Sequence, residues 1–165
     1  MSDYIISCCS TADLTKEHFE KKDIQYICFH YELDGVQYPD DLGQSMPFDK
    51  FYQAMTDGAD TKTSQINADE FEAYFESFLQ QGKDILHLCL SSGITGVFNS
   101  ANIAKDMLEE KYPDRKIYIV DSLAASSGFY LAIRGCQRHV GRLHPDRGDT
   151  QDARSHARQD SGRAT

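Results

Sequence analysis

The segment from 85 to 101 constrains the fold more than any other part of the chain. It opens with Ile-Leu-His-Leu-Cys-Leu at 85–90, an apolar run that is typical of a buried strand. The run ends at a Ser-Ser-Gly turn, 91–93, and a helix is expected to begin soon after Gly96. Four apolar residues then recur at helical spacing and predict one buried helix face, namely Val97, Ala101, Ala104 and Leu108.

The turn between this strand and this helix is a candidate anion site. In an open α/β sheet, ligands bind at the carboxyl ends of strands, where backbone N–H groups and the helix dipole favour negative charge. The hydroxyls of Ser91 and Ser92 can add hydrogen bonds there. These residues suggest a site for a small anionic head group, and the alternative is that they only turn the chain.

The rest of the chain alternates strands and helices, which predicts an α/β fold with a parallel or mixed sheet flanked by helices. We expect strands near 4–9, 24–31, 85–90 and 117–120, and helices near 47–56, 68–81, 97–111 and 124–133. Asp34-Gly35 predicts a hairpin turn that returns through 36–38. The aromatic faces of the two middle helices, together with His30 and His87, are expected in the core.

Small hydroxyl side chains recur in four polar turns, and three of these turns would lie along the carboxyl edge of a parallel sheet. The turns are Ser10-Thr11, 61–65 (Thr-Lys-Thr-Ser-Gln), Ser91-Ser92 and Asp121-Ser122. Some of these residues have a structural alternative. Thr63 and Ser64 can cap the following helix, although Asn67 with Glu70 three residues later resembles a capping box. Asp121 is expected to accept hydrogen bonds from turn amides.

Composition excludes several classes of function. The net charge of −9 argues against nucleic acid or an anionic membrane as a partner. We expect no transmembrane segment and no signal peptide, hence a cytoplasmic protein. The five cysteines are an odd number, mostly within apolar runs, which favours reduced thiols over a disulfide framework. Their spacing does not match a zinc site, so we expect no metal and no cofactor.

The last 32 residues differ from the rest in composition. Residues 134–165 contain seven of the eight arginines and none of the nine lysines, and they lack Phe, Tyr, Ile and Glu. Such a segment buries too little apolar surface to offset its ordering entropy. We therefore expect residues 1–133 to form the folded domain and 134–165 to be a disordered or frame-shifted tail.

Four motifs in register resemble those of the DegV family of bacterial fatty-acid-binding proteins. They are Ser10-Thr11-Ala12-Asp13-Leu14, Thr63-Ser64-Gln65, the run from Ser91 to Gly96 with Asn99-Ser100-Ala101, and Val120-Asp121-Ser122. The resemblance covers 1 to about 133 and implies the first of two α/β domains. It departs from the family at Cys9, where the family has aspartate. Because the resemblance stops near 133, we expect the second domain to be missing.

The resemblance implies a non-catalytic carrier that binds a long-chain fatty acid between two domains and presents it to a fatty-acid kinase. Thr63 and Ser92 would bind the carboxylate. Supporting residues at the site would be Ser10, Thr11, Ser64, Ser91, Gly93, Asp121 and Ser122. The acyl tail would lie against Phe98, Ala124 and Ala125.

Two other classes of function stay open. A serine hydrolase would use Ser91 or Ser92, but the chain lacks the G-x-S-x-G nucleophile elbow. A phosphate- or nucleotide-binding domain would use Gly93 and Gly96, but neither G-x-G-x-x-G nor G-x-x-x-x-G-K-[ST] occurs. The sequence therefore favours lipid binding, without indicating the length or saturation of the acyl chain.

Overall fold

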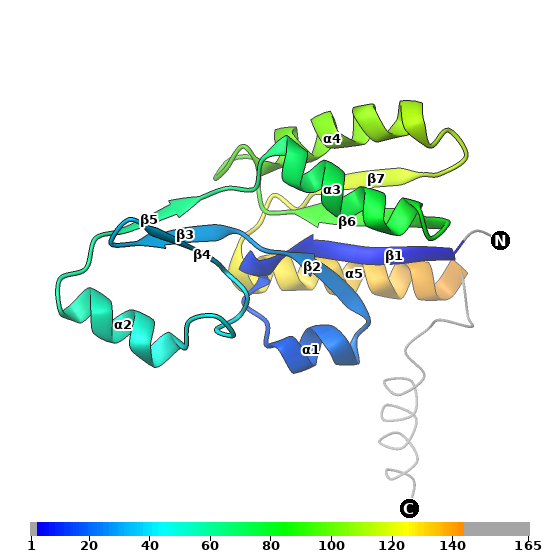
Figure 1. Cartoon of the computed structure of the whole chain (residues 1–165). Coiled ribbons are helices and arrows are strands. Elements are labelled where there is room, and N and C mark those ends of the chain that lie inside the picture. The colour runs from blue at the N-terminus through cyan, green and yellow to red at the C-terminus, as the bar shows by residue number, and fades with distance from the viewer. Residues whose placement is uncertain (1–2, 144–165) are drawn as a thin grey trace, which may run out of the picture. The chain divides into compact units, whose positions relative to one another are not determined.

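The computed structural model describes residues 3–143 and contains a four-stranded parallel sheet (Figure 1). Its strands are β1 (Asp3–Cys9), β2 (Ile24–Ile27), β6 (Lys83–Cys89) and β7 (Ile117–Asp121), in the order β2-β1-β6-β7. Because every neighbouring pair is parallel, all four carboxyl ends lie at one edge. The predicted α/β class is confirmed.

The segment at 85–101 takes the expected position at the centre of the fold. β6 lies between β1 and β7, and Ile85, Leu88 and Cys89 are fully buried. The helix that follows, α4 (Val97–Lys111), matches its predicted bounds. The four apolar residues of its predicted face are all fully buried. A central parallel strand is covered on both faces, which explains why this run is apolar at nearly every position.

α3 (Ala68–Leu79) and α4 cover one face of the sheet, and the short α1 (Lys16–Lys21) lies on the other. α3 begins with the predicted capping box. The Asn67 side chain accepts the Glu70 N–H at 2.9 Å, and the Glu70 carboxylate accepts the Asn67 N–H at 2.8 Å. Phe71 and Phe75 are fully buried, so the aromatic face of this helix is core, as expected.

The predicted single strand at 24–31 is wrong, because its second half belongs to a second, three-stranded antiparallel sheet. Its strands are β3 (His30–Leu33), β4 (Val36–Pro39) and β5 (Thr61–Ser64), in the order β4-β3-β5. The long strand divides at Cys28-Phe29, because the Phe29 N–H bonds the Ser10 hydroxyl and leaves the ladder of β2. Asp34 and Gly35 both have positive φ, which confirms the tight hairpin turn between β3 and β4.

The aromatic face of α2 (Phe48–Thr56) does not lie in the core, contrary to expectation. The side chains of Phe48 and Tyr52 remain 58% and 63% exposed. The helix belongs to the same end of the molecule as the small sheet, beyond the carboxyl ends of the main strands (Figure 1). Its periodicity identified an amphipathic helix correctly, but the apolar side faces a surface cavity.

The chain divides into two units, and the boundary between them falls after Tyr130, inside α5 (Ser126–Leu143). The predicted end of this helix at 133 is wrong, since the helix continues for ten more residues. Arginine, glutamine and leucine in 134–143 all favour helix. The remainder of the predicted tail, 144–165, lies outside the described residues. Within 3–143, the helices lack the combination of length and apolar character needed to cross a membrane.

Candidate functional site

The turn after β1 fixes the position of the small sheet. The Ser10 hydroxyl accepts the Phe29 N–H at 3.1 Å and donates to Asp40 Oδ2 at 2.8 Å. Ser10 itself is buried. These bonds join the end of β1 to the residues that flank β3 and β4. The Ser10 hydroxyl therefore has a structural role in holding the small sheet, and its role in ligand binding stays a prediction.

The turn after β6 is held by the turn after β7. Asp121 Oδ1 accepts the Ser92 N–H at 3.1 Å and the Leu123 N–H at 3.0 Å, as predicted for this residue. A hydrogen bond from the Ser92 side chain, aided by the two backbone bonds and opposed by slight burial, lowers the pKa of Asp121. The Ser91 hydroxyl accepts the Gly93 N–H at 3.2 Å. Ser92 itself is exposed to solvent.

Ser122 closes the turn that follows β7. Its hydroxyl donates to the Ala124 carbonyl at 3.1 Å and accepts the Ala124 N–H at 3.3 Å. The Ser91 N–H also bonds the Ala124 carbonyl, at 3.2 Å. The two serine-containing turns are thus one hydrogen-bonded unit, and Ser122 has a structural role within it.

Gln65 connects the small sheet to this unit. Its side-chain oxygen accepts bonds from the Thr95 hydroxyl at 2.6 Å and from the Gly96 N–H at 2.8 Å. Thr63 and Ser64 precede it on β5 and are exposed. Neither of them caps α3, because Asn67 takes that position. The helix-capping alternative for this pair is therefore wrong.

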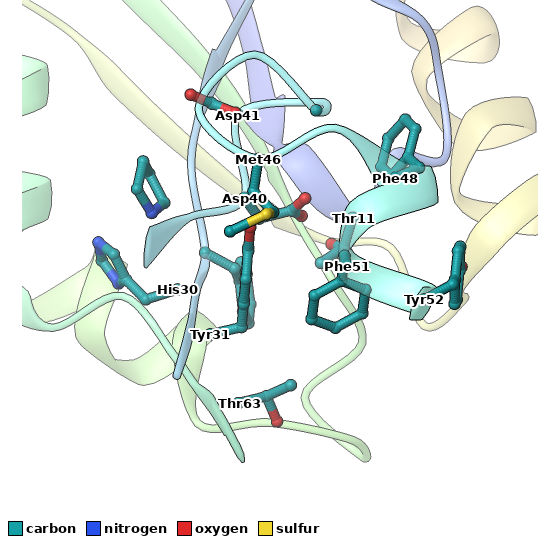
Figure 2. Close-up of a pocket in the computed structure, with 13 residues that line it drawn as sticks. Thr11, His30, Tyr31, Asp40, Asp41, Met46, Phe48, Phe51, Tyr52 and Thr63 are labelled. Atoms are coloured by element: carbon teal, nitrogen blue, oxygen red, sulfur yellow. The ribbon is translucent and has the colours of Figure 1, made fainter. Parts of the chain in front are cut away.

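A pocket of about 280 Å³ opens between the small sheet, the loop after β4 and α2 (Figure 2). Its walls are mainly apolar and aromatic. Thr11 and Thr63 are the two candidate site residues that it contains. The complete lining comprises Thr11, Phe29, His30, Tyr31, Pro39, Asp40, Asp41, Gly43, Met46, Phe48, Phe51, Tyr52 and Thr63.

The aromatic wall is built from contacts between β3, β4 and α2. Tyr31 stacks on Tyr38 with a ring-centroid distance of 5.6 Å. It also makes an edge contact with Phe51 at 5.0 Å, and Phe51 makes a similar contact with Tyr52 at 5.6 Å. These ring contacts hold α2 against the small sheet and leave an apolar surface between them.

The polar groups of the pocket lie at different ends. Figure 2 shows Thr63 at one end, Asp41 at the other, and Asp40 with Met46 between them. Partial burial acts to raise the pKa of Asp41, but hydrogen bonds from Ser45 and Gln44 outweigh it and lower the pKa. Asp41 is thus an anion near neutral pH. A bound anion would be repelled at this end.

Thr11 and His30 also contribute polar side chains to the lining. Thr11 Oγ1 is buried and has no hydrogen-bond partner among the residues that the structure describes. His30 Nε2 lies 3.4 Å from Glu70 Oε1, and its side chain is 19% exposed. His30 therefore belongs to the pocket wall rather than to the core. His87, by contrast, is fully buried, as predicted.

Sequence reasoning missed most of the apolar lining. Phe29, Tyr31 and Phe51 received no ligand role, although the aromatic face of 47–56 was a usable signal. The residues expected around the acyl tail, Phe98, Ala124 and Ala125, are absent from the lining of this pocket. Ala125 is exposed, and the other two are half-buried. Their role in ligand binding stays a prediction.

Comparisons with known proteins agree on one family. The family model described as "Uncharacterised protein, DegV family" matches residues 6–141. A DegV domain-containing protein of Clostridium perfringens is 38% identical over 133 residues, which are 81% of this chain and 46% of the relative. The chain thus spans about half the length of the curated relatives that it matches.

Solved structures show the same relationship. A fatty-acid (stearic acid)-binding protein of Eubacterium ventriosum has a TM-score of 0.72 at 30% identity, covering 92% of this chain and 51% of that one. A DegV lipid-binding protein of Thermotoga maritima has a TM-score of 0.69 at 29% identity, covering 92% and 51%. With the fold, the four motifs and a family match over most of its length, this chain belongs to the DegV family.

Proposed function

We propose that this chain binds a long-chain fatty acid and acts as a non-catalytic acyl carrier in the cytoplasm. The observation that carries the proposal is the position of Thr63. This motif residue lies at one end of an apolar pocket, and Gln65, two residues later, bonds the turn that begins with Ser91 and Ser92. Hydroxyl donors beside an apolar surface suit the two parts of a fatty acid, its carboxylate and its acyl chain.

In the proposed complex, the Thr63 hydroxyl donates to the carboxylate, and the Ser92 hydroxyl turns from Asp121 to donate to it as well. The N-terminus of α4, which begins at Val97, favours its negative charge. The tail extends from Thr63 along the aromatic wall of Tyr31 and Phe51. Asp41, at the end of the pocket opposite Thr63, repels a second anionic group and so sets the direction of binding. The turns containing Ser91 and Ser122 hold Ser92 in position. We call Thr63 and Ser92 the carboxylate clamp.

The apolar contacts supply most of the binding free energy. Burial of each methylene contributes about 0.8 kcal/mol, so a long acyl chain contributes roughly 10 kcal/mol before ordering costs. The pocket alone, at about 280 Å³, is at the small end of ligand sites. We expect this chain to bind more weakly than a relative of twice its length.

Two sources support the ligand class. The first is the family resemblance of the four motifs, which implies a fatty acid held by hydroxyl side chains. The second is the Eubacterium ventriosum relative, whose description as a stearic acid-binding protein applies to a chain 30% identical over most of this one. The resemblance also implies a fatty-acid kinase as the partner that phosphorylates the bound carboxylate.

The experiment has two stages. Lipid extracted from the purified full chain is first identified by mass spectrometry, and a co-purified long-chain fatty acid is the expected result. Affinity for that fatty acid is then measured for Thr63→Val and Ser92→Ala. Each hydrogen bond to a charged group contributes about 1.5–3 kcal/mol, so each variant should bind roughly ten- to a hundredfold more weakly.

Ser77→Ala is a matched control, because the hydroxyl of this exposed serine on α3 bonds only the Tyr74 carbonyl in the described contacts. It should bind like the unmodified chain. Unchanged affinity in both clamp variants would exclude Thr63 and Ser92 as carboxylate ligands. Ester hydrolysis, or stabilisation by a nucleotide in place of a fatty acid, would instead favour one of the two other classes of function.

A further inference from the structure

The last residues of two neighbouring strands are both cysteines. Cys9 ends β1 and Cys89 ends β6, and these strands pair in parallel with Cys8 opposite Leu88. The next positions in that register are Cys9 and Cys89. Both side chains are fully buried. All five cysteines of the chain are free thiols.

The distance between neighbouring strands suits a covalent bond between these residues. Adjacent strands lie about 4.8 Å apart, and a disulfide spans Cα atoms about 4.4–6.8 Å apart. Cys9 and Cys89 also project from the same face of the sheet, because side chains directly opposite in a ladder share a face. Each cysteine ends its strand, so the backbone beyond it can adjust to the bond.

A buried histidine lies beside the pair. His87 Nε2 is 3.8 Å from Cys9 Sγ, and His87 Nδ1 is 2.9 Å from the Ser7 hydroxyl. The Ser7 hydroxyl is in turn 2.7 Å from the Tyr74 hydroxyl. Edge contacts from Phe71 and Phe75 hold the imidazole ring, at centroid distances of 5.3 and 5.2 Å. This network directs Nε2 at the Cys9 sulfur.

The surroundings give the two thiols different reactivity. The hydrogen bond from Cys89 outweighs burial and, with those from His87 and the Leu90 N–H, lowers the pKa of Cys9. The same bond and burial raise the pKa of Cys89. Burial also raises the pKa of Cys8, which projects from the opposite face of β1. Cys9 is therefore the thiol with thiolate character, and only thiolates are effective nucleophiles.

We propose that Cys9 and Cys89 form an oxidation site that closes to a disulfide when the protein meets hydrogen peroxide. His87 accepts the proton of Cys9, and the thiolate attacks one peroxide oxygen. The O–O bond breaks, giving a Cys9 sulfenic acid and a hydroxide that takes up a proton to become water. The Cys89 sulfur then displaces the sulfenic hydroxyl and loses its own proton. In sum, two thiols and one peroxide give one disulfide and two waters.

This site is separate from the proposed fatty-acid function. The two cysteines lie at the carboxyl ends of β1 and β6, and neither lines the pocket. They immediately precede the two turns of the candidate site, those that begin at Ser10 and near Ser91. Because peroxide must reach a buried sulfur, oxidation requires local opening of this edge and should be slow.

The full chain, freed of lipid, is incubated with hydrogen peroxide, alkylated without reduction, and analysed by intact mass and peptide mapping. The expected product has lost two hydrogen atoms, and its only cross-linked peptides contain Cys9 and Cys89. Dithiothreitol should restore the original mass. A sulfinic or sulfonic acid at Cys9 without a cross-link, or a bridge through Cys8, would overturn the proposal. So would oxidation only after the protein is unfolded with urea.

Variants separate the roles of the two sulfurs. Cys89→Ala should abolish the cross-link, and sulfenic acid, detected with dimedone, should form at Cys9 more slowly, because the bond that lowers the pKa of Cys9 is lost. Cys8→Ala is the matched control, as it removes a neighbouring buried thiol and should cross-link like the unmodified chain. His87→Gln should slow oxidation at least tenfold while leaving the same product. Circular dichroism confirms folding of each variant, and the mapping of the unmodified chain tests the proposal independently of them all.

Discussion

The side-chain oxygen of Gln65 accepts the backbone N–H of Gly96 at 2.8 Å, and this bond joins two parts of the candidate site that lie 31 residues apart. Close approach is possible because Gly96 has no side chain. A Cβ there would lie 3.1 Å from Gln65 Nε2. The third residue of the Thr-Ser-Gln motif therefore positions the first, by fixing β5 beside the serine turn.

Gln65→Ala should loosen this connection. Loss of its bonds to Thr95 and Gly96 should lower the free energy of unfolding by about 1 kcal/mol and weaken fatty-acid binding severalfold. Urea denaturation and equilibrium binding measure the two effects. Gln53→Ala is the control, since Gln53 bonds only Asp57 on the exposed surface of α2 among the described contacts. Equal fatty-acid affinity in the two variants would contradict the positioning role of Gln65.

Phe51→Ala should weaken fatty-acid binding by roughly tenfold or more, since the ring forms part of the pocket wall and supports Tyr31. Met55→Ala, one turn further along α2, removes a side chain that is exposed and lies outside the pocket lining. It should leave the affinity unchanged. If both variants bind like the unmodified chain, the acyl tail does not use this wall.

Thr11→Val should stabilise the ligand-free chain. The substitution keeps the shape of the side chain and removes a buried hydroxyl that has no partner within the described residues, which should raise the free energy of unfolding by about 1 kcal/mol. Thr15→Val is the comparison variant, and it should lower the free energy of unfolding. The Thr15 hydroxyl accepts the His18 N–H at the start of α1, so its loss should cost about 1 kcal/mol. Destabilisation by both variants would show that Thr11 has a partner in solution.

Asp121 should make stability depend on pH. Its pKa is lowered in the folded protein from an ordinary value of 3.8. The carboxylate therefore contributes stability above that value, and the contribution is lost as the pH falls through the folded pKa. Asp121→Asn should be less stable than the unmodified chain at pH 7, and the difference should shrink in thermal melts below about pH 4. Amide exchange at Ser92 and Leu123 should be faster in the variant at pH 7, and equal exchange would contradict the assignment.

Asn67→Ala should lower the free energy of unfolding without changing the affinity for the fatty acid. It removes the capping box at the start of α3, and loss of such a cap costs about 1 kcal/mol. Fatty-acid affinity should stay the same, since Asn67 does not line the pocket. A parallel loss of affinity would show that α3 is coupled to the site.

The sequence by itself determined the elements whose signals are local. The apolar run at 85–90 predicted the central strand, and helical spacing from Val97 to Leu108 predicted α4 with its observed bounds. Asn67 with Glu70 predicted the start of α3, and Asp34-Gly35 predicted a hairpin. Each signal acts within a few residues, through capping, turn geometry or the period of one element. The motif resemblance likewise identified the family.

Only the tertiary structure decided what depends on contacts between distant residues. The strand expected at 24–31 divides because Ser10, nineteen positions away, bonds the Phe29 N–H. Periodicity made α2 amphipathic, but only the small sheet placed its aromatic face on a pocket instead of the core. The pairing of Cys9 with Cys89 follows from strand register, because the two residues are 80 positions apart in the sequence and no local pattern connects them. Such contacts depend on the packing of the whole domain, and no short segment encodes them.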